Sequence, residues 1–102
     1  MEEKRECCHT TKTKERTEKE YKDLIHRLNR IEGHVRGIKK MVESDTYCTD
    51  ILIQVSAVNA ALNSFSKVLL GNHIRTCVAE DIRQGKEETV EELVATLQKL
   101  MK

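Results

Sequence analysis

The stretch CTDILIQVSAVNAALNSFSKVLLGNHIRTCVAEDI, residues 48–82, decides the fold. Its apolar residues recur three and four positions apart, which is the spacing of one face of an α-helix. Gly71 lies inside this pattern, but Ile74 and Val78 continue it, and Gly85 beyond it is typical of a helix end. The stretch therefore predicts one long helix from about residue 48 to 82. It is too apolar to stand alone in water, so it should pack against other elements and partners.

Helical periodicity also appears on both sides of this stretch. Residues 18–43 carry apolar side chains at the same spacing, and Gly33 and Gly37 share one face of that pattern, where we interpret them as sites of close helix packing. Residues 44–46 have the chemistry of a break and of a helix N-cap. A last helix should begin near residue 87. The chain thus predicts an all-α protomer of three helices with a long central helix.

The composition fits a helical protein whose own core is thin. The 102 residues include no proline, two tyrosines and one phenylalanine, while 34% are charged and 38% are apolar. Sheets favour aromatic residues and turns favour proline, so their scarcity favours helices. A chain of this size with few large apolar side chains is commonly completed by association with further copies.

The N-terminal segment predicts a disordered polar tail over residues 1–17, ahead of a helical domain over residues 18–102. It lacks the apolar centre of a secretory signal, and no apolar run approaches the roughly 20 residues that cross a bilayer. We therefore expect a cytoplasmic protein with reduced thiols, available for metal or redox chemistry. In the tail, Cys7, Cys8 and His9 could bind a metal, against the entropic cost of ordering a flexible segment.

His73 and Cys77 stand four positions apart, which places an imidazole and a thiol on the same face of a helix. A helical cysteine is also often just a small buried side chain. Cys48 lies 29 positions before Cys77, and one straight helix would separate the two thiols by roughly 44 Å. If two copies of this helix pack antiparallel about a two-fold axis, Cys48 of one copy meets His73 and Cys77 of the other, twice per dimer.

Such a site would offer two thiolates and one imidazole. This set favours the soft ion Cu(I). Structural zinc normally takes four protein ligands, and no fourth is evident unless the tail contributes one. Hard ions such as magnesium or calcium would require carboxylates, which this set lacks. We therefore expect Cu(I) at an intersubunit site.

Three motifs in the chain resemble those of the copper-sensing repressor family, the CsoR-like proteins: NRIEGHVRGI (29–38), Tyr47-Cys48 followed by TDILIQVSAV (49–58), and NHIRTC (72–77). The resemblance covers about residues 20–101. It implies a helical protomer without a helix-turn-helix, an antiparallel dimer built on the second helix, and a dimer-of-dimers tetramer. It also implies a trigonal Cu(I) site at the cysteine–histidine–cysteine set described above.

By the same resemblance, two side chains should support the three ligands. These are Tyr47 and, allowing a one-residue gap, Glu92, with Glu91 as the alternative. Nickel and cobalt members carry a further histidine where Arg16 stands in this chain, and this departure favours copper. Formaldehyde-responsive and persulfide-responsive members each lack one of the three ligands that this chain has.

The resemblance further implies a basic surface that binds operator DNA. Arg27 matches an arginine of the first helix that is implicated in DNA binding. Ser64 stands where some members have an arginine, and Lys67, one turn on, could compensate. Such cations would neutralise DNA phosphates. Because acidic residues interleave with them, a solvated helix face is the alternative. Further cations lie near Arg27: Arg30, Arg36, Lys39 and Lys40.

We therefore expect a transcriptional repressor that binds operator DNA without metal and is released by Cu(I), which derepresses copper-efflux genes. Its expected partners are DNA and further copies of the chain, as a homodimer and homotetramer, with no membrane; a copper chaperone is a further candidate. The alternatives are a sensor of another metal or of thiol-reactive stress through Cys48 and Cys77, and a copper buffer without a DNA role. We expect no enzyme, because no nucleophile, base and orienting group can be identified.

Overall fold

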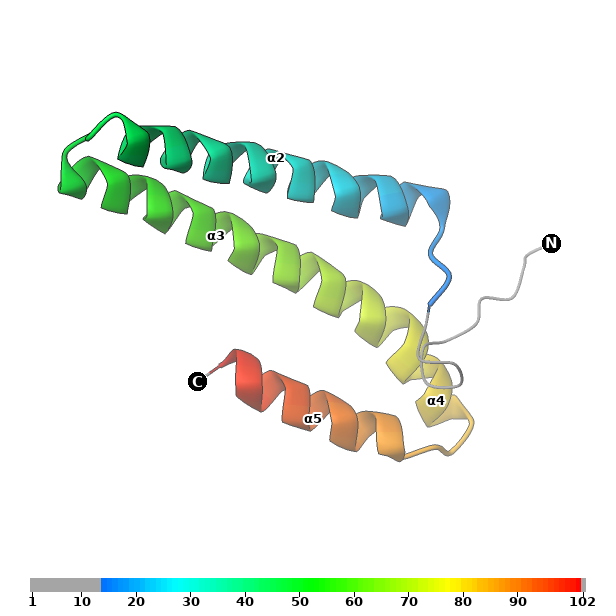
Figure 1. Cartoon of the computed structure of the whole chain (residues 1–102). Helices are drawn as coiled ribbons and strands as arrows, with labels where there is room; N and C mark the ends of the chain where they lie inside the picture. The colour runs from blue at the N-terminus through cyan, green and yellow to red at the C-terminus, as the bar shows by residue number, and fades with distance from the viewer. Residues whose placement is uncertain (1–13, 102) are drawn as a thin grey trace. The chain divides into compact units, whose positions relative to one another are not determined.

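The computed structural model describes residues 14–101, and all regular structure in that range is helical. The predicted all-α protomer with a long central helix is thereby confirmed. Residues 1–13 of the predicted tail, and residue 102, lie outside the described range. The elements in chain order are α2 (Glu18–Glu43), α3 (Cys48–His73), a π-helical turn η1 (Ile74–Val78), α4 (Ala79–Arg83) and α5 (Glu88–Leu100) (Figure 1).

Helix α2 begins and ends at the residues that its periodicity predicted. At its start, Thr17 Oγ1 accepts a hydrogen bond from the backbone amide of Glu20 at 3.1 Å. This bond satisfies one of the amides that the first turn of a helix leaves without an intrahelical acceptor. The residue predicted as the last of the tail is therefore the cap that starts the helix.

Residues 44–46 terminate α2. The amide of Asp45 donates to the carbonyl of Val42 at 3.1 Å, and that of Thr46 donates to the carbonyl of Met41 at 2.9 Å. This pair of bonds is the Schellman motif of a helix C-terminus, with Asp45 in the left-handed conformation at φ 59°. The capping chemistry expected for a following helix is thus used to end the preceding one.

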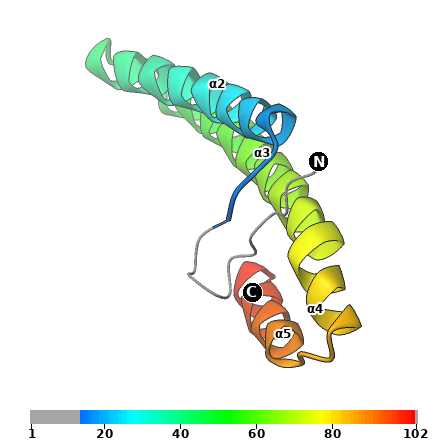
Figure 2. The same ribbon diagram turned by 90° about the vertical axis from the view of Figure 1, so that its right-hand side faces the viewer.

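Two compact units make up the chain, and residues 17–69 form one of them. In this unit α2 runs antiparallel alongside α3, as two perpendicular views show (Figures 1 and 2). Its buried apolar side chains are Leu24 and Ile31 from α2 and Val58 from α3. Many larger apolar side chains of the unit remain exposed: Tyr21, Ile25, Leu28, Val35, Val42, Leu52, Ile53 and Leu62.

The predicted close packing at Gly33 and Gly37 is not present within the described residues. A Cβ added at Gly37 would meet nothing within 4 Å, and one added at Gly33 would meet only the Arg36 side chain, at 3.8 Å. Both glycines are therefore tolerated in α2 without being required by the packing of a single chain.

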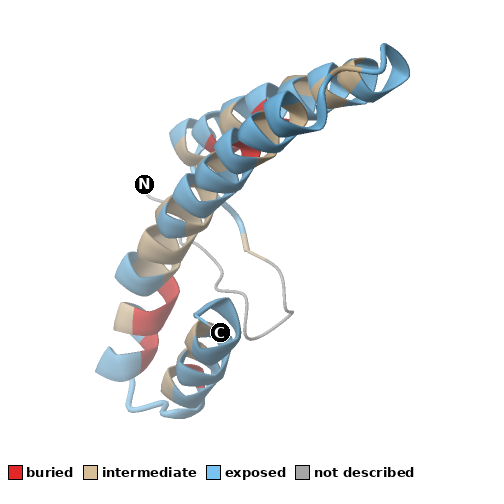
Figure 3. Cartoon of the chain, turned by 90° about the vertical axis from the view of Figure 1, so that its left-hand side faces the viewer, coloured by how far each residue is buried: buried red, intermediate tan, exposed pale blue. Residues whose placement is uncertain are grey.

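The second unit comprises residues 70–101 together with residues 14–16. Here the turn η1 and helix α4 lie beside α5, and the buried residues gather on the side of these elements that faces α5 (Figure 3). The buried side chains of this unit are Cys77, Val78, Asp81 and Thr89. The core of this unit is consequently small and partly polar.

The long regular helix predicted to about residue 82 contains an irregularity. At η1 the amide of Ala79 donates to the carbonyl of Ile74, five residues back, instead of four. Such π turns within α-helices are uncommon and often occur at functional sites. Residues 48–83 therefore consist of two α-helical segments joined through a wider turn that contains Cys77.

Gly85 ends α4 through a second Schellman motif. The amide of Gly85 donates to the carbonyl of Ile82 at 3.0 Å, and the amide of Lys86 donates to the carbonyl of Asp81 at 2.9 Å. Gly85 has a φ of +78°, which is unfavourable for residues with a Cβ. The predicted stop at this glycine is confirmed.

We expect Gly85→Ala to lower the free energy of unfolding by about 1–2 kcal/mol, because alanine is strained in the left-handed conformation. Gly37→Ala is the matched control. It places the same methyl group in a regular helix with open space around it, where alanine should raise stability by about 1 kcal/mol. Chemical denaturation of both variants and of the wild type measures these changes in the free energy of unfolding. Equal effects at the two positions would contradict the assigned role of Gly85.

Candidate metal centre and nucleic-acid interface

Cys48 is the first residue of α3, and its thiol is free and exposed. The neighbouring Tyr47 precedes the helix, and its side chain is 73% exposed. The carbonyl of Tyr47 accepts hydrogen bonds from the amides of Asp50 at 3.0 Å and Ile51 at 3.3 Å. The backbone of this turn is therefore well anchored, while both side chains remain available on the surface of the unit.

His73 and Cys77 lie four positions apart at the other end of α3. His73 is the last residue of that helix and is half-buried, while Cys77 lies within η1 and is fully buried. The predicted helical proximity of these two residues is therefore supported by the secondary structure, although the intervening turn is π-helical instead of α-helical. The unit shields the thiol of Cys77 from water, which suits a soft metal ligand more than a reactive surface cysteine.

Thr76 links this turn to the preceding helix and to the N-terminal segment. Its hydroxyl donates to the carbonyl of Asn72 at 2.7 Å and accepts from Lys14 Nζ at 2.8 Å. The same oxygen lies 3.9 Å from Cys77 Sγ. Because a hydroxyl has one proton, the short bond to Asn72 takes precedence over the long sulfur contact. These contacts fix the backbone next to the buried thiol.

Asp81 lies in α4, directly after this turn, and joins α4 to α5. It stands four residues after Cys77 and is 1% exposed, and its Oδ2 accepts a hydrogen bond from the hydroxyl of Thr89, which is 4% exposed. Thr89 lies in the first turn of α5. A buried hydrogen bond of this kind is costly to leave unmade, so the start of α5 is firmly held against α4, the helix that follows the turn containing Cys77.

The two candidate supporting glutamates, Glu91 and Glu92, are both exposed on α5. Glu92 follows Thr89 by three positions and therefore lies on the same side of the helix as that buried side chain, whereas Glu91 lies on another side. The geometry of α5 favours Glu92 as the residue nearer to the core of this unit.

The described residues of one chain do not assemble all three predicted ligands. No group of three or more histidine, cysteine, aspartate or glutamate side chains that could hold a metal ion occurs among residues 14–101. His73 and Cys77 form a pair, while Cys48 is at the opposite end of α3. The tail residues Cys7, Cys8 and His9 lie outside the described range.

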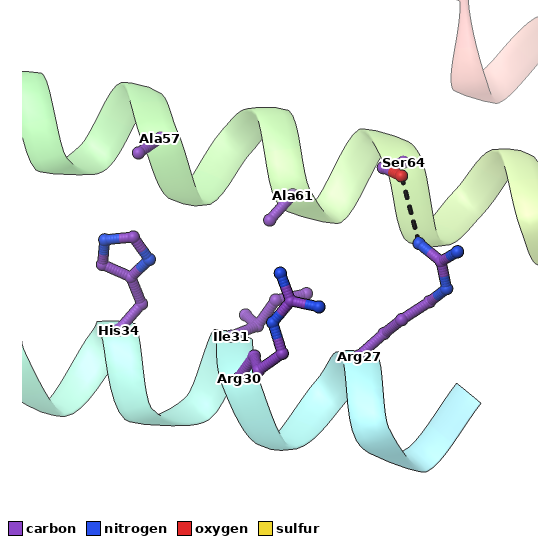
Figure 4. A pocket seen from close by; sticks show the side chains of 7 residues that line it. All are labelled: Arg27, Arg30, Ile31, His34, Ala57, Ala61 and Ser64. Atoms are coloured by element: carbon purple, nitrogen blue, oxygen red, sulfur yellow. Dashed lines mark hydrogen bonds between the residues drawn. The ribbon is translucent and has the colours of Figure 1, made fainter. Parts of the chain in front are cut away.

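The predicted DNA-binding arginines fall on two sides of α2. Arg27 and Arg30 line a cavity of about 230 Å³ between α2 and α3, together with His34 and small side chains of α3 (Figure 4). Arg36 follows Arg27 by nine positions, which is about two and a half helical turns, and so points away from this cavity. The remaining predicted cations are exposed on α2 or α3: Lys39, Lys40 and Lys67.

Arg27 is fixed by two partners. Its Nε lies 3.3 Å from Asp23 Oδ1, one turn earlier in α2, and its Nη1 donates to Ser64 Oγ of α3 at 3.2 Å (Figure 4). Ser64, which stands where some relatives have an arginine, therefore orients the arginine of the neighbouring helix. Sequence reasoning did not identify this contact.

His34 and Gln54 form a second contact between the two helices that sequence reasoning missed. His34 Nε2 lies 3.0 Å from Gln54 Oε1. His34 is exposed, and it also lines the cavity. Its spacing of seven from Arg27 and four from Arg30 places all three residues on one side of the helix, and this signal was available in the sequence.

Comparison with known proteins gives consistent matches. The family model for metal-sensitive transcriptional repressors matches residues 20–99. The copper-sensing transcriptional repressor CsoR of Bacillus subtilis is 46% identical over 88 residues, covering 85% of this chain and 87% of that protein. No helix in the described part of the chain has the length and apolar character needed to cross a membrane.

Two solved structures share the fold. The copper-sensing repressor CsoR with Cu(I) from Geobacillus thermodenitrificans matches with a TM-score of 0.83 and 45% identity, covering 86% of this chain and 93% of that one. The nickel-responsive transcriptional regulator InrS matches with a TM-score of 0.69 and 37% identity, covering 78% of this chain and 91% of that one. The same helical scaffold thus occurs in regulators that respond to different metals.

Proposed function

The chain belongs to the metal-sensitive transcriptional repressors and is not an enzyme, and from that premise we propose that it senses Cu(I). In this proposal the metal-free protein binds operator DNA in the cytoplasm. Cu(I) binding lowers its affinity for DNA and derepresses genes for copper efflux. A copper chaperone could deliver the ion.

The observation that carries the proposal is the pair of His73 and the buried Cys77 on one turn, with Cys48 exposed at the opposite end of the same helix. Two thiolates and one imidazole favour Cu(I). A single chain presents only two of the three ligands together. The third would come from a second copy, so each metal site would contain residues of both protomers.

One side of α3 supports an antiparallel arrangement of the two copies. Residues on this side recur alternately four and three positions apart, which is the spacing of a coiled-coil seam. Leu52 and Leu62 are 65% and 43% exposed, so this side is not covered within the unit that contains them. The seam consists of Cys48, Leu52, Val55, Asn59, Leu62, Ser66, Leu69 and His73.

The seam also gives a register for the proposed dimer. If the two-fold axis passes between Asn59 and Leu62, each seam residue faces another seam residue of the partner. In that register Cys48 faces the partner's His73, and Leu52 faces the partner's Leu69. The leucines would then be buried at the same time as the two metal sites are completed. A second pairing of such dimers would give the expected tetramer.

The response would run from the ligands to α5. Tyr47 adjoins Cys48, and Glu92 lies on the side of α5 that Thr89 holds against the core. Side chains that hydrogen-bond to a ligating histidine orient its ring and tune the metal site. We therefore propose Tyr47 and Glu92 as the groups that connect metal binding to a change in α5.

Nickel is the second candidate metal, because a nickel-responsive regulator shares the fold. The ligands in this chain favour copper, since Arg16 cannot replace a nickel-binding histidine and two thiolates are soft ligands. A copper buffer without a DNA role is a different class of function, and it would bind Cu(I) but not operator DNA.

The test is a titration of labelled operator DNA with the metal-free protein and with the protein loaded with Cu(I), Ni(II) or Zn(II). We expect tight binding without metal and a loss of about 5–150-fold with Cu(I), the usual range for allosteric coupling. Ni(II) and Zn(II) should have smaller effects. If only Ni(II) released the protein from DNA, nickel would be the metal that it senses. The absence of specific DNA binding under all conditions would exclude the repressor function for this chain.

A further inference from the structure

The cavity between α2 and α3 opens on the surface of the unit and has three basic side chains in its lining. Helix α2 contributes Arg27, Arg30, His34 and the buried Ile31, and α3 contributes Ala57, Ala61 and Ser64 (Figure 4). The two alanines recur four positions apart on α3, so their small side chains leave space beside the longer side chains of α2. The α2 wall is thus mostly basic, around one isoleucine, and the α3 wall is small and neutral.

No carboxylate lines this cavity. Asp23 neutralises part of the charge of Arg27 from one turn away, through Nε. Arg30 makes no hydrogen bond or ion pair with any described residue. Gathering two guanidinium groups and an imidazole around one space is unfavourable unless an anion or water screens them. The arrangement is therefore suited to receive negative charge from outside the chain.

Two of the three groups are held by α3. Ser64 Oγ accepts from Arg27 Nη1 at 3.2 Å, and Gln54 Oε1 lies 3.0 Å from His34 Nε2. As an imidazolium, histidine donates from both ring nitrogens, so His34 can keep its contact with Gln54 and still present Nδ1–H to an anion. Preorganised donors bind an anion better than freely rotating ones, because less side-chain entropy is lost.

We propose that Arg27, Arg30 and His34 form a seat for a single phosphate group, and that operator DNA fills it with a backbone phosphate. A phosphate has several acceptor oxygens and can take donors from all three side chains at once, and arginine binds phosphate in a bidentate manner. Arg27 and Arg30 were already expected to contact DNA. The proposal adds His34 as a third donor to the phosphate, and Ser64 and Gln54 as residues that position the donors. The assignment to DNA depends on the proposed repressor function.

Lys22 provides a matched control. It is an exposed cation of the same helix, its ammonium lies 3.6 Å from Glu18 Oε2, and it belongs to neither proposed site. We expect Arg30→Ala and His34→Ala each to weaken operator binding by about tenfold, and to lower the slope of log affinity against log salt concentration by about one phosphate contact. Lys22→Ala should change the affinity less than about threefold. Circular dichroism checks that all three variants remain helical.

Inorganic phosphate tests the seat independently of DNA. At matched ionic strength, phosphate should weaken wild-type DNA binding more than chloride does, and this difference should be lost in His34→Ala. In the absence of DNA, phosphate should also shift the NMR signals of the His34 ring, with those of the exposed His26 as the internal control.

The two measurements separate the possible failures. If Arg30→Ala and His34→Ala bind DNA as Lys22→Ala does while phosphate still shifts the His34 signals, the seat takes small phosphates and the DNA assignment is overturned. If phosphate shifts neither histidine and the variants match the control, there is no seat. A wild-type protein that does not bind operator DNA would instead refute the proposed function, and the phosphate measurement would still report on the seat.

Discussion

Mixing two variants that are each defective in copper binding, Cys48→Ala and Cys77→Ala, should restore part of the Cu(I) binding of the wild type. In an antiparallel dimer each site takes Cys48 from one copy and His73 and Cys77 from the other. A dimer with one copy of each variant therefore has one complete site, and a second site that lacks both cysteines. Each variant alone should lose more than the roughly 10–100-fold in affinity that removal of a supporting group costs.

The recovered amount distinguishes an intersubunit site from a site within one chain. With complete exchange of subunits, half of the dimers are mixed and each has one intact site of two, so about a quarter of the wild-type capacity should return. The measurement is Cu(I) competition with a chelator of known affinity, before and after co-refolding. The control mixes Cys48→Ala with the double variant that lacks both cysteines, which cannot form an intact site. Recovery in the control, or none in the experiment, would contradict the proposed geometry.

His73→Ala should still bind Cu(I) but should no longer be released from operator DNA by it. Two thiolates alone can hold the soft ion, and we propose that the imidazole adds the contact through which α5 responds to the metal. We expect the 5–150-fold loss of DNA affinity on copper binding to shrink to less than about threefold. The measurement is a DNA titration with and without Cu(I) at matched salt.

His26→Ala is the matched control for this experiment, because His26 is exposed on α2 and belongs to neither proposed site. It should bind copper and leave DNA as the wild type does. If Cu(I) releases His73→Ala as completely as it releases this control, the coupling does not run through His73. If His73→Ala fails to bind Cu(I) at all, the imidazole is essential for affinity, and the division of roles between thiolates and imidazole is wrong.

Much of the fold follows from local sequence signals. The bounds of α2 agree with the periodicity because Thr17 caps its start and the turn after Glu43 has the bonds of a helix end. The glycine at position 85 predicted the end of α4 because its backbone requirement is local. These features depend on neighbours within a few residues, and such interactions can be inferred from sequence alone.

The features that were missed depend on contacts between distant residues or on the detailed course of the backbone. The π turn at 74–78 preserves the apolar pattern of an α-helix, so periodicity could not reveal it. The bond between Asp81 and Thr89 crosses a turn whose geometry sequence does not fix. The sequence predicts that His73 and Cys77 lie near each other because only four positions separate them, and their joint role as ligands stays a prediction. The position of Cys48 relative to them depends on a second copy and stays a prediction.

Because few side chains are buried in one chain, folding of this protein should depend on its assembly with further copies. Only Leu24, Ile31, Val58, Cys77 and Val78 are buried apolar residues in the described part of the chain, whereas a domain of this length usually needs a larger core to offset the entropy of folding. If partner copies supply the missing burial, folding and assembly become one concentration-dependent event. The melting temperature should then rise with protein concentration, and newly made subunits would become ordered only once enough of them had accumulated to meet.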